Sequence, residues 1–295
     1  MLTEQRNPNT TNIDQLSALE IVQRINAEDQ TVAMAVQATL PQIAQAVEGI
    51  VERLGRGGRL IYLGAGTSGR LGILDAVECV PTFNTEPEQV QALIAGGDTA
   101  FLKAVEGAED NRDAAAADLK ARSLGANDAL IGIAASGRTP YVLGGIAYGR
   151  SIGALTVGVS CNVPSALLDA VEIGIGVPVG PEVITGSTRM KAGTAQKMVL
   201  NMLSTAAMIR LGKVYGNLMV DVKVTNEKLK GRARGILEEI TGLDAEAAAK
   251  LLDESGNQVK VAAVMHHRQV DRETAQRILE ENDGFLRRVT EESGS

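Results

Sequence analysis

The sequence predicts an α/β protein: a doubly wound, parallel five-stranded sheet with N-terminal helices and a small helical C-terminal domain. Three observations predict this fold class. Short apolar runs alternate with longer helical patterns between residues 55 and 225, as in strands joined by right-handed helical crossovers. Glycine-rich loops follow two of these runs, where a strand should pass into a helix. After about residue 225 the strand patterns stop and helical ones continue.

The elements follow in order along the chain. Residues 1–15 are polar and are expected to form an arm or loop. Ser17-Ala18-Leu19-Glu20 is a capping-box pattern that opens a helix, and helical spacing of apolar residues runs over about 32–54 until a glycine-rich turn at 55–58. Strands are expected near 59–63, 91–95, 129–134, 154–159 and 172–177, because such short apolar runs are typical of strands buried on both faces.

Helices are expected near 69–79, 99–121, 140–150 and 187–211 around the sheet, and near 226–240, 244–253, 256–266 and 271–281 after it. Asp244 and Asp271 are the expected N-caps of two of the late helices. We therefore divide the chain into an N-terminal arm with helices (1–54), a ligand-binding sheet domain (55–225) and a helical C-terminal domain (226–295).

Charge and composition argue against several classes of partner and of site. The 295 residues carry a formal net charge of -7 and no long basic run, which argues against partners such as nucleic acid or an anionic membrane surface. The only cysteines, Cys79 and Cys161, are too few for a disulfide framework or a four-ligand zinc site. No apolar signal segment opens the chain, and no stretch approaches the roughly 18 apolar residues of a membrane helix. We expect a cytoplasmic protein without a metal.

Three loops rich in glycine and hydroxyl residues indicate a ligand that carries a phosphate. Gly64-Ala65-Gly66-Thr67-Ser68-Gly69 and Ser136-Gly137-Arg138-Thr139-Pro140 each follow an expected strand, and Gly186-Ser187-Thr188-Arg189-Met190-Lys191 opens a long helix. Glycines let a ligand approach the backbone, while hydroxyls and free helix N–H groups bind anions. We predict that phosphate is held by Thr67, Ser68, Ser136, Arg138, Thr139, Ser187 and Thr188, with Gly66, Gly69 and Gly137 permitting close approach. As a check, Ser136→Ala should mainly raise KM.

The loops allow two other interpretations. Each loop alone could serve only as a cap or turn, but three at one sheet edge favour a sugar phosphate. The first loop also fits the G-x-G-x-x-G dinucleotide pattern, which requires an acidic residue about 20 positions on, at the end of the second strand. Glu86 and Glu88 precede that strand and Asp98 lies further away. A dinucleotide-binding site of this kind also gives no role to the second loop, at Ser136.

Five stretches of the sequence resemble a known family. Residues 60–75, 105–110, 132–141, 185–197 and 215–221 resemble the sugar isomerase (SIS) domain and, within it, the N-acetylmuramic acid 6-phosphate etherases; the likeness runs from about Leu2 to the C-terminus. The resemblance implies a carbon–oxygen lyase that cleaves the D-lactyl ether of its substrate, giving N-acetylglucosamine 6-phosphate and D-lactate. It also implies no cofactor and no metal, a homodimer, and a role in the recycling of cell-wall amino sugar.

The resemblance places a catalytic pair at Glu78 and Glu109. The reaction needs one group to move the C2 proton and one to protonate the departing oxygen, and buried carboxylates can do both. At about 1.5 Å per helical residue, Glu78 lies about 13 Å beyond the loop end, comparable to the length of a hexose 6-phosphate. The family often has Ser where this chain has Val77. We assign Glu78 as the main acid/base and proton donor to the leaving group; which glutamate handles the C2 proton stays open.

From the residues alone, both glutamates have plainer interpretations. Glu78 could be a surface carboxylate at a helix end, and Glu109 sits in an acidic cluster typical of a solvated helix start. The family is also similar to vertebrate glucokinase regulatory proteins, which bind sugar phosphates without catalysis. An aldose–ketose isomerase or a sugar-phosphate sensor is therefore the alternative function. His266 and His267 are expected at a surface or interface, and residues 4–7 could close over a site or form an untethered tail.

Overall fold

The computed structural model of the chain describes residues 1–103 and 105–291. Their contacts form two compact units. One, here called the sheet unit, comprises Met1–Val77 and Glu88–Ser204; the other, the helical unit, comprises Glu78–Pro87 and Thr205–Ser295. Two long helices, α3 (Gly66–Phe83) and α8 (Lys191–Arg210), contribute residues to both units. The three-part division drawn from the sequence stays a prediction.

The sheet unit contains a five-stranded parallel sheet with the order β2-β1-β3-β4-β5. Its strands match the predicted runs to within two residues: β1 Leu60–Gly64, β2 Val90–Ile94, β3 Ala129–Ile133, β4 Leu155–Ser160 and β5 Ile173–Gly176. The chain passes from β1 to β2 in one direction and returns to β3 on the other side of β1. The carboxyl ends of β1 and β3 therefore form the topological switch point, where ligands bind in sheets of this kind.

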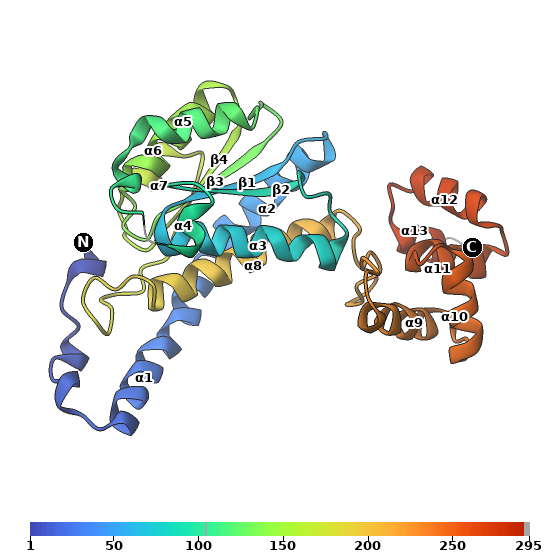
Figure 1. Cartoon of the computed structure of the whole chain (residues 1–295), viewed down its shortest axis with the longest axis horizontal. Coiled ribbons are helices and arrows are strands. Elements are labelled where there is room, and N and C mark those ends of the chain that lie inside the picture. Colours follow the sequence, from blue (N-terminus) through green and yellow to red (C-terminus); the bar gives the residue numbers. More distant parts are fainter. Residues whose placement is uncertain (104, 292–295) are drawn as a thin grey trace. The chain divides into compact units, whose positions relative to one another are not determined.

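Helices cover both faces of the sheet (Figure 1). One face is packed by α5 (Arg112–Ala121), α6 (Pro140–Ser151) and α7 (Ala166–Ala170), around a core that includes Leu63, Leu119, Leu130, Ile146 and Leu167. The other carries α2 (Leu40–Gly55) and the parts of α3 and α8 that belong to this unit. The three inner strands β1, β3 and β4 are buried along their whole length, whereas the edge strands β2 and β5 are partly buried.

The capping box before α1 (Ala18–Gln37) is confirmed: the Ser17 hydroxyl accepts from the Glu20 N–H, and the Glu20 carboxylate accepts from the Ser17 N–H. The prediction of one helix over 32–54 is wrong. The helix ends at Gln37, and α2 begins anew at Leu40 with a proline in its first turn. Pro41 has no N–H to continue the α1 hydrogen-bond ladder, so the chain restarts a helix there.

The prediction of a single helix over 99–121 is also wrong. The segment contains α4 (Thr99–Leu102), a 3-10 turn at Ala108–Asp110 and then α5. Gly107 has a φ of 73°, which a helix does not allow, and the Asn111 side chain accepts from the Asp113 and Ala114 N–H groups as a new N-cap. The helix expected from 187 begins instead at Lys191, and α7 was not predicted.

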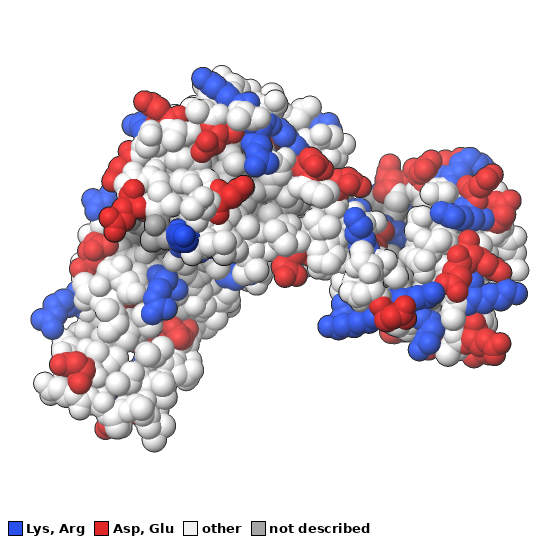
Figure 2. Space-filling model, viewed as in Figure 1, with Lys and Arg blue, Asp and Glu red and all other residues white. Residues whose placement is uncertain are grey.

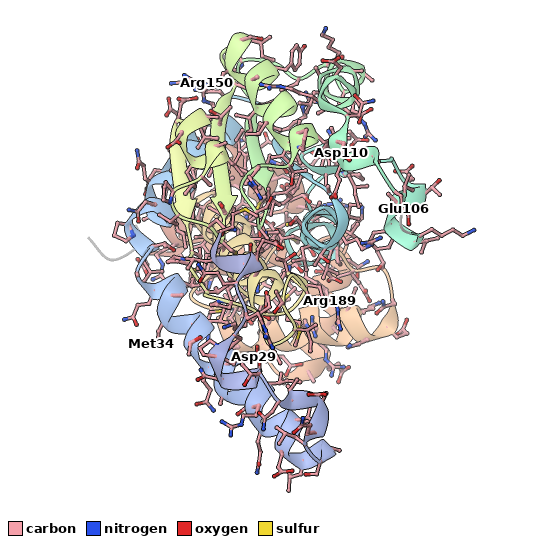
Figure 3. The ribbon with its side chains drawn as sticks, turned by 90° about the vertical axis from the view of Figure 1, so that its left-hand side faces the viewer. Asp29, Met34, Glu106, Asp110, Arg150 and Arg189 are labelled. Atoms are coloured by element: carbon pink, nitrogen blue, oxygen red, sulfur yellow. The ribbon has the colours of Figure 1, made fainter. Side chains whose placement is uncertain are left out.

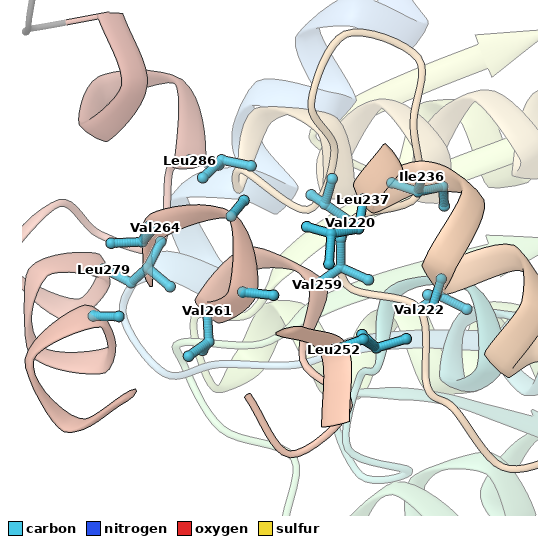
Figure 4. Close-up of a cluster of buried hydrophobic side chains, with 14 of the residues drawn as sticks. Val220, Val222, Ile236, Leu237, Leu252, Val259, Val261, Val264, Leu279 and Leu286 are labelled. Atoms are coloured by element: carbon cyan, nitrogen blue, oxygen red, sulfur yellow. The ribbon is translucent and has the colours of Figure 1, made fainter. Parts of the chain in front are cut away.

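The helical unit has its own apolar core (Figure 4). Side chains such as Leu237, Leu252, Val261 and Val264 fill it, and charged side chains of both signs lie on the face of this unit seen in Figure 2. Its helices are α9 Glu227–Thr241, α10 Ala245–Glu254, α11 Val259–Arg268, α12 Arg272–Glu281 and α13 Leu286–Glu291, of which α13 was not predicted. The N-caps Asp244 and Asp271 are confirmed. Of the helices that the structure describes, none is long and apolar enough to cross a membrane.

Candidate functional site

The two predicted loops meet at the switch point. Gly64 ends β1 and Gly66 begins α3, while β3 ends at Ile133 and its loop leads through Ser136 into α6 at Pro140. Because β1 and β3 are neighbours, their following loops lie side by side at the carboxyl edge of the sheet. A Cβ on Gly64 would come within 2.6 Å of the Gly69 nitrogen, so only glycine permits this tight entry into α3.

Several hydroxyls in these loops are free to bind a ligand. Within residues 1–103 and 105–291, the half-buried hydroxyls of Thr67, Thr139, Ser187 and Thr188 have no hydrogen-bond partner. Ser68 differs, since its buried hydroxyl donates to Gln196 Oε1 at 3.0 Å. The Ser136 hydroxyl accepts from the Arg138 N–H at 3.3 Å and keeps its proton for a further acceptor. The free set is therefore a group of donors that an anion can use.

The third predicted loop, residues 186–191, leads into α8, whose first turn lies close to the start of α3. A Cβ on Gly193, in the first turn of α8, would lie 3.5 Å from Thr67 Cγ2, so α8 packs onto the start of α3. Its N–H groups at Lys191 and Ala192, however, are bound by the Glu182 carboxylate, each at 2.9 Å. Burial raises the pKa of Glu182, which is 0% exposed. The Ser187 and Thr188 hydroxyls are free, but this carboxylate already occupies two N–H groups of the helix start.

The basic residues beside the loops divide into two kinds. Arg70 donates to the Ala100 and Phe101 carbonyls at 2.7 and 2.9 Å, and Lys191 forms a buried ion pair with Glu28 at 2.6 Å. The side chains of Arg138 and Arg189 are exposed and form no ion pair or hydrogen bond with the rest of the described chain. Of the four basic residues near the loops, these two are available to an anionic ligand.

Glu109 faces the same region. A cavity of about 230 Å³ opens beside the start of α3, and its lining includes Gly66, Arg70, Glu106 and Glu109. Figure 3 shows Glu106 and Asp110 on the exposed segment between α4 and α5. Arg70 holds the carbonyls of α4 just before this segment. The structure thus brings Glu109 and the first glycine loop to one cavity, which the sequence alone did not predict.

Glu78 lies on α3, the helix that begins at the first loop, and its side chain is exposed. It belongs to the helical unit, whereas Glu109 and all the predicted phosphate-binding residues belong to the sheet unit. One turn earlier on α3, buried Asp75 accepts from the Tyr62 hydroxyl at 2.8 Å and from Lys197 Nζ at 2.7 Å. These bonds fix the middle of α3 to β1 and α8.

Sequence reasoning missed the polar residues in the interior around the loops, among them buried Asn162, Glu182 and Gln196 and half-buried Glu28. Their role comes from partners far away in the chain, and no local pattern marks them. Across the part of the chain that the structure describes, no group of three His, Cys, Asp or Glu side chains could hold a metal ion. The His266 and His267 rings stand edge to face, 5.6 Å apart, and burial followed by the His266 charge lowers the pKa of His267.

Comparisons with known proteins connect this geometry to a family. Residues 42–150 match the glucokinase regulatory protein N-terminal SIS domain. An N-acetylmuramic acid 6-phosphate etherase of Vibrio vulnificus strain YJ016 is 57% identical over 97% of this chain and 96% of its own length. One of Clostridium beijerinckii is 53% identical over 99% of this chain and 96% of its own. The chain belongs to the N-acetylmuramic acid 6-phosphate etherase family.

The etherase family assignment agrees with the fold. A phosphoheptose isomerase from Neisseria gonorrhoeae superimposes with a TM-score of 0.50 and 16% identity, over 65% of this chain and 98% of the isomerase. At that identity the likeness shows the SIS fold alone. Membership in the etherase family rests on relatives that match almost the whole chain, the helical unit included.

Proposed function

We propose that this protein cleaves the D-lactyl ether of N-acetylmuramic acid 6-phosphate by elimination and water addition, giving N-acetylglucosamine 6-phosphate and D-lactate. One observation supports it above others: Glu109 and Gly66, the first residue of α3, line the same cavity at the first glycine loop. The first turn of α3 and the neighbouring loop before α6 carry the free hydroxyls of Thr67 and Thr139. Relatives of this name, more than half identical over nearly the whole chain, support the choice of substrate.

The phosphate is assigned to the loops. Thr67 and Thr139 supply free hydroxyls, the first turn of α3 supplies N–H groups, and Arg138 supplies a positive charge. Ser68 and Ser136 complete the predicted set, with Ser68 also fixed to Gln196. Ser187 and Thr188 add hydroxyls from the loop before α8. Gly66 has a φ of 52°, and a Cβ there would meet nothing within 4 Å, so the backbone is open to the ligand.

The glutamates supply the proton transfers. Ring opening of the sugar exposes the C1 aldehyde and makes the C2 proton acidic. A carboxylate removes that proton, the bond from C3 to the lactyl oxygen breaks, and the departing oxygen takes a proton from an acid. Water then adds across the C2–C3 double bond. We assign Glu78 to the leaving oxygen, and Glu109, at the cavity beside Gly66, to the complementary transfer.

The test is incubation with N-acetylmuramic acid 6-phosphate in D₂O, followed by NMR of the products. The expected result is D-lactate together with deuterium at C2 of N-acetylglucosamine 6-phosphate. Binding without lactate release would contradict the proposal and favour a sugar-phosphate sensor. Proton transfer between C1 and C2 of an aldose without lactate release would favour an isomerase. Glu78→Gln should abolish both the lactate and the deuterium signal.

We also propose a homodimer. The helix α1 leaves Leu19, Val22 and Met34 exposed, each by more than half of its residue surface. Large apolar side chains exposed on one helix support an interface there. For location, we propose the cytoplasm, where the buried thiols of Cys79 and Cys161 would stay reduced. There the enzyme would act in amino-sugar catabolism during peptidoglycan recycling.

A further inference from the structure

The N-terminal arm has a feature that an untethered tail would lack. Its buried residues, Thr3, Asn7 and Thr10, are polar, and Thr3 is 0% exposed. Buried polar groups are retained where they form hydrogen bonds, because leaving them unpaired is costly. Each of these three side chains bonds to a different point of the loops at the carboxyl edge of the sheet. The arm is therefore fixed to that edge.

The Thr3 contact leads to the Ser136 loop through one amide group. Asn162 Nδ2 donates to Thr3 Oγ1 and to the Ala135 carbonyl, each at 2.9 Å, and Asn162 Oδ1 accepts from the Thr3 N–H at 3.4 Å. Ala135 directly precedes Ser136. Asn162 itself is held by Ser160, whose hydroxyl accepts from the Asn162 N–H at 3.1 Å. Thr3 thus fixes the orientation of the amide that holds the start of this loop.

The other contacts lead to the loop before α8. Asn7 Nδ2 donates to the Pro181 carbonyl at 3.1 Å and Thr10 Oγ1 to the Val183 carbonyl at 2.9 Å. These carbonyls flank Glu182, the carboxylate that caps α8. Asn9 Nδ2 donates to Glu28, which pairs with buried Lys191. Burial alone would raise the pKa of Glu28, but hydrogen bonds from Lys191, Asn9 and Asn7 hold it below its ordinary value.

We infer that the N-terminal arm, residues 2–10, is a fixed part of the sugar-phosphate site and that Thr3 is a positioning residue, acting through Asn162 on the turn that carries Ser136. The arm ties this turn to the loop of Ser187 and Thr188, although the two lie far apart in the sequence. A phosphate bound by both loops requires their hydroxyls at a fixed separation. The inference relies on the proposed function for the identity of the substrate and for the assignment of its phosphate to these loops.

The test compares Thr3→Val, which removes the hydroxyl and keeps the shape, with Thr3→Ser, which keeps the hydroxyl. Thr11→Val is the matched control, because Thr11 directly follows the arm, is exposed, and its side chain has no partner in the described chain. Loss of one hydrogen bond should raise KM for N-acetylmuramic acid 6-phosphate about five- to tenfold, with kcat within about twofold. Thr3→Ser and Thr11→Val should retain the KM of the unmodified protein.

A second measurement needs neither activity nor ligand. Amide hydrogen exchange should increase at residues 135–139 in Thr3→Val and stay unchanged at 64–69. Unchanged exchange at 135–139 would overturn the coupling through Asn162. Faster exchange with an unchanged KM would overturn the role in substrate binding, and a loss of kcat alone would do the same. If the unmodified protein released no lactate, the proposed function would fail, while the exchange result and the affinity for glucose 6-phosphate, measured by calorimetry, would still decide the role of Thr3.

Discussion

At the scale of single residues, hydroxyl side chains that look equivalent in the sequence differ in whether they have a hydrogen-bond partner in the structure. Ser68 and Thr67 are adjacent hydroxyls of one loop, yet Ser68 is bonded to Gln196 whereas Thr67 has no partner in the described chain. The same division holds between Ser136 and Thr139 in the second loop. Removing a bonded hydroxyl disturbs the protein and the ligand together, while removing a free one affects only the ligand.

Thr139→Val tests this distinction. The Thr139 hydroxyl forms no cap bond to α6, so its removal should leave the melting temperature unchanged. KM should rise about five- to tenfold, as expected for one lost hydrogen bond to an anion, and kcat should stay within about twofold. Steady-state kinetics and a thermal melt check both parts. A lower melting temperature with normal KM would mean that the hydroxyl serves the fold and not the phosphate.

Glu109→Gln tests the catalytic assignment in the sheet unit. The amide keeps the shape of the side chain at the cavity but cannot accept or deliver the proton, so kcat should fall about 10²–10⁴-fold. Asp110→Asn removes the same charge from the adjacent exposed position and serves as the control. The prediction fails if the two variants lose activity equally, because a general charge effect would then explain the result.

At the scale of elements, the opposite edge of the sheet is built for stability. Buried Asp128, just before β3, accepts from the Arg59 backbone N–H and side chain and from the Gly125 N–H. Burial alone would raise the pKa of Asp128, but the hydrogen bonds from Arg59 hold it below its ordinary value of 3.8. Ligands of such sheets bind at the carboxyl ends of the strands, so we expect this amino-terminal edge to take no part in substrate binding or catalysis.

Asp128→Asn should therefore lower the free energy of unfolding by about 2–3 kcal/mol at neutral pH and leave kcat and KM unchanged. A carboxylate whose pKa is lower in the folded state stabilises above its unfolded pKa and loses that contribution as the pH falls. The difference between the variant and the unmodified protein should thus shrink below about pH 4. Denaturant unfolding at pH 7 and pH 3 measures it; a difference that grows on acidification would contradict the assignment.

The elements also show what sequence can predict. The strands were located closely because each is an apolar run bounded by glycine or polar residues, a local signal. The helix expected over 99–121 failed because Arg70, some thirty positions away, binds the Ala100 and Phe101 carbonyls, and because Gly107 and Asn111 start a new helix. The start of α8 shifted because Glu182 caps it from outside the helix.

The candidate site shows the same limit. Glycine loops after strands were found from sequence because their chemistry is local. The cavity that joins Glu109 to Gly66, and the bridge from Thr3 to Ala135 through Asn162, depend on residues distant in the chain. Only the resemblance to the etherases singled out Glu109, while Glu78 also had the spacing along the helix from the first loop in its favour; both side chains are exposed.

At the scale of the whole molecule, each of the two units contains an apolar core of its own. The helix α1 contributes little to these cores, because only Val32 and Val36 of its residues are buried. Leu19 and Val22, one turn apart, share an exposed face. A helix gains most of its stability from packing its apolar face, and in the proposed dimer a second copy would cover the exposed face of α1.

Light scattering at micromolar concentration should accordingly give about twice the chain mass of 30.9 kDa. Val22→Glu places a charge in the proposed interface and should lower the mass to that of one chain, because burying an unpaired carboxylate opposes association. Gln23→Glu adds the same charge at the next exposed position, turned by about 100° on the helix, and should leave the dimer intact. A monomeric mass for the unmodified protein would reject the dimer. Dissociation by both variants would show that net charge, and not the face of Val22, controls assembly.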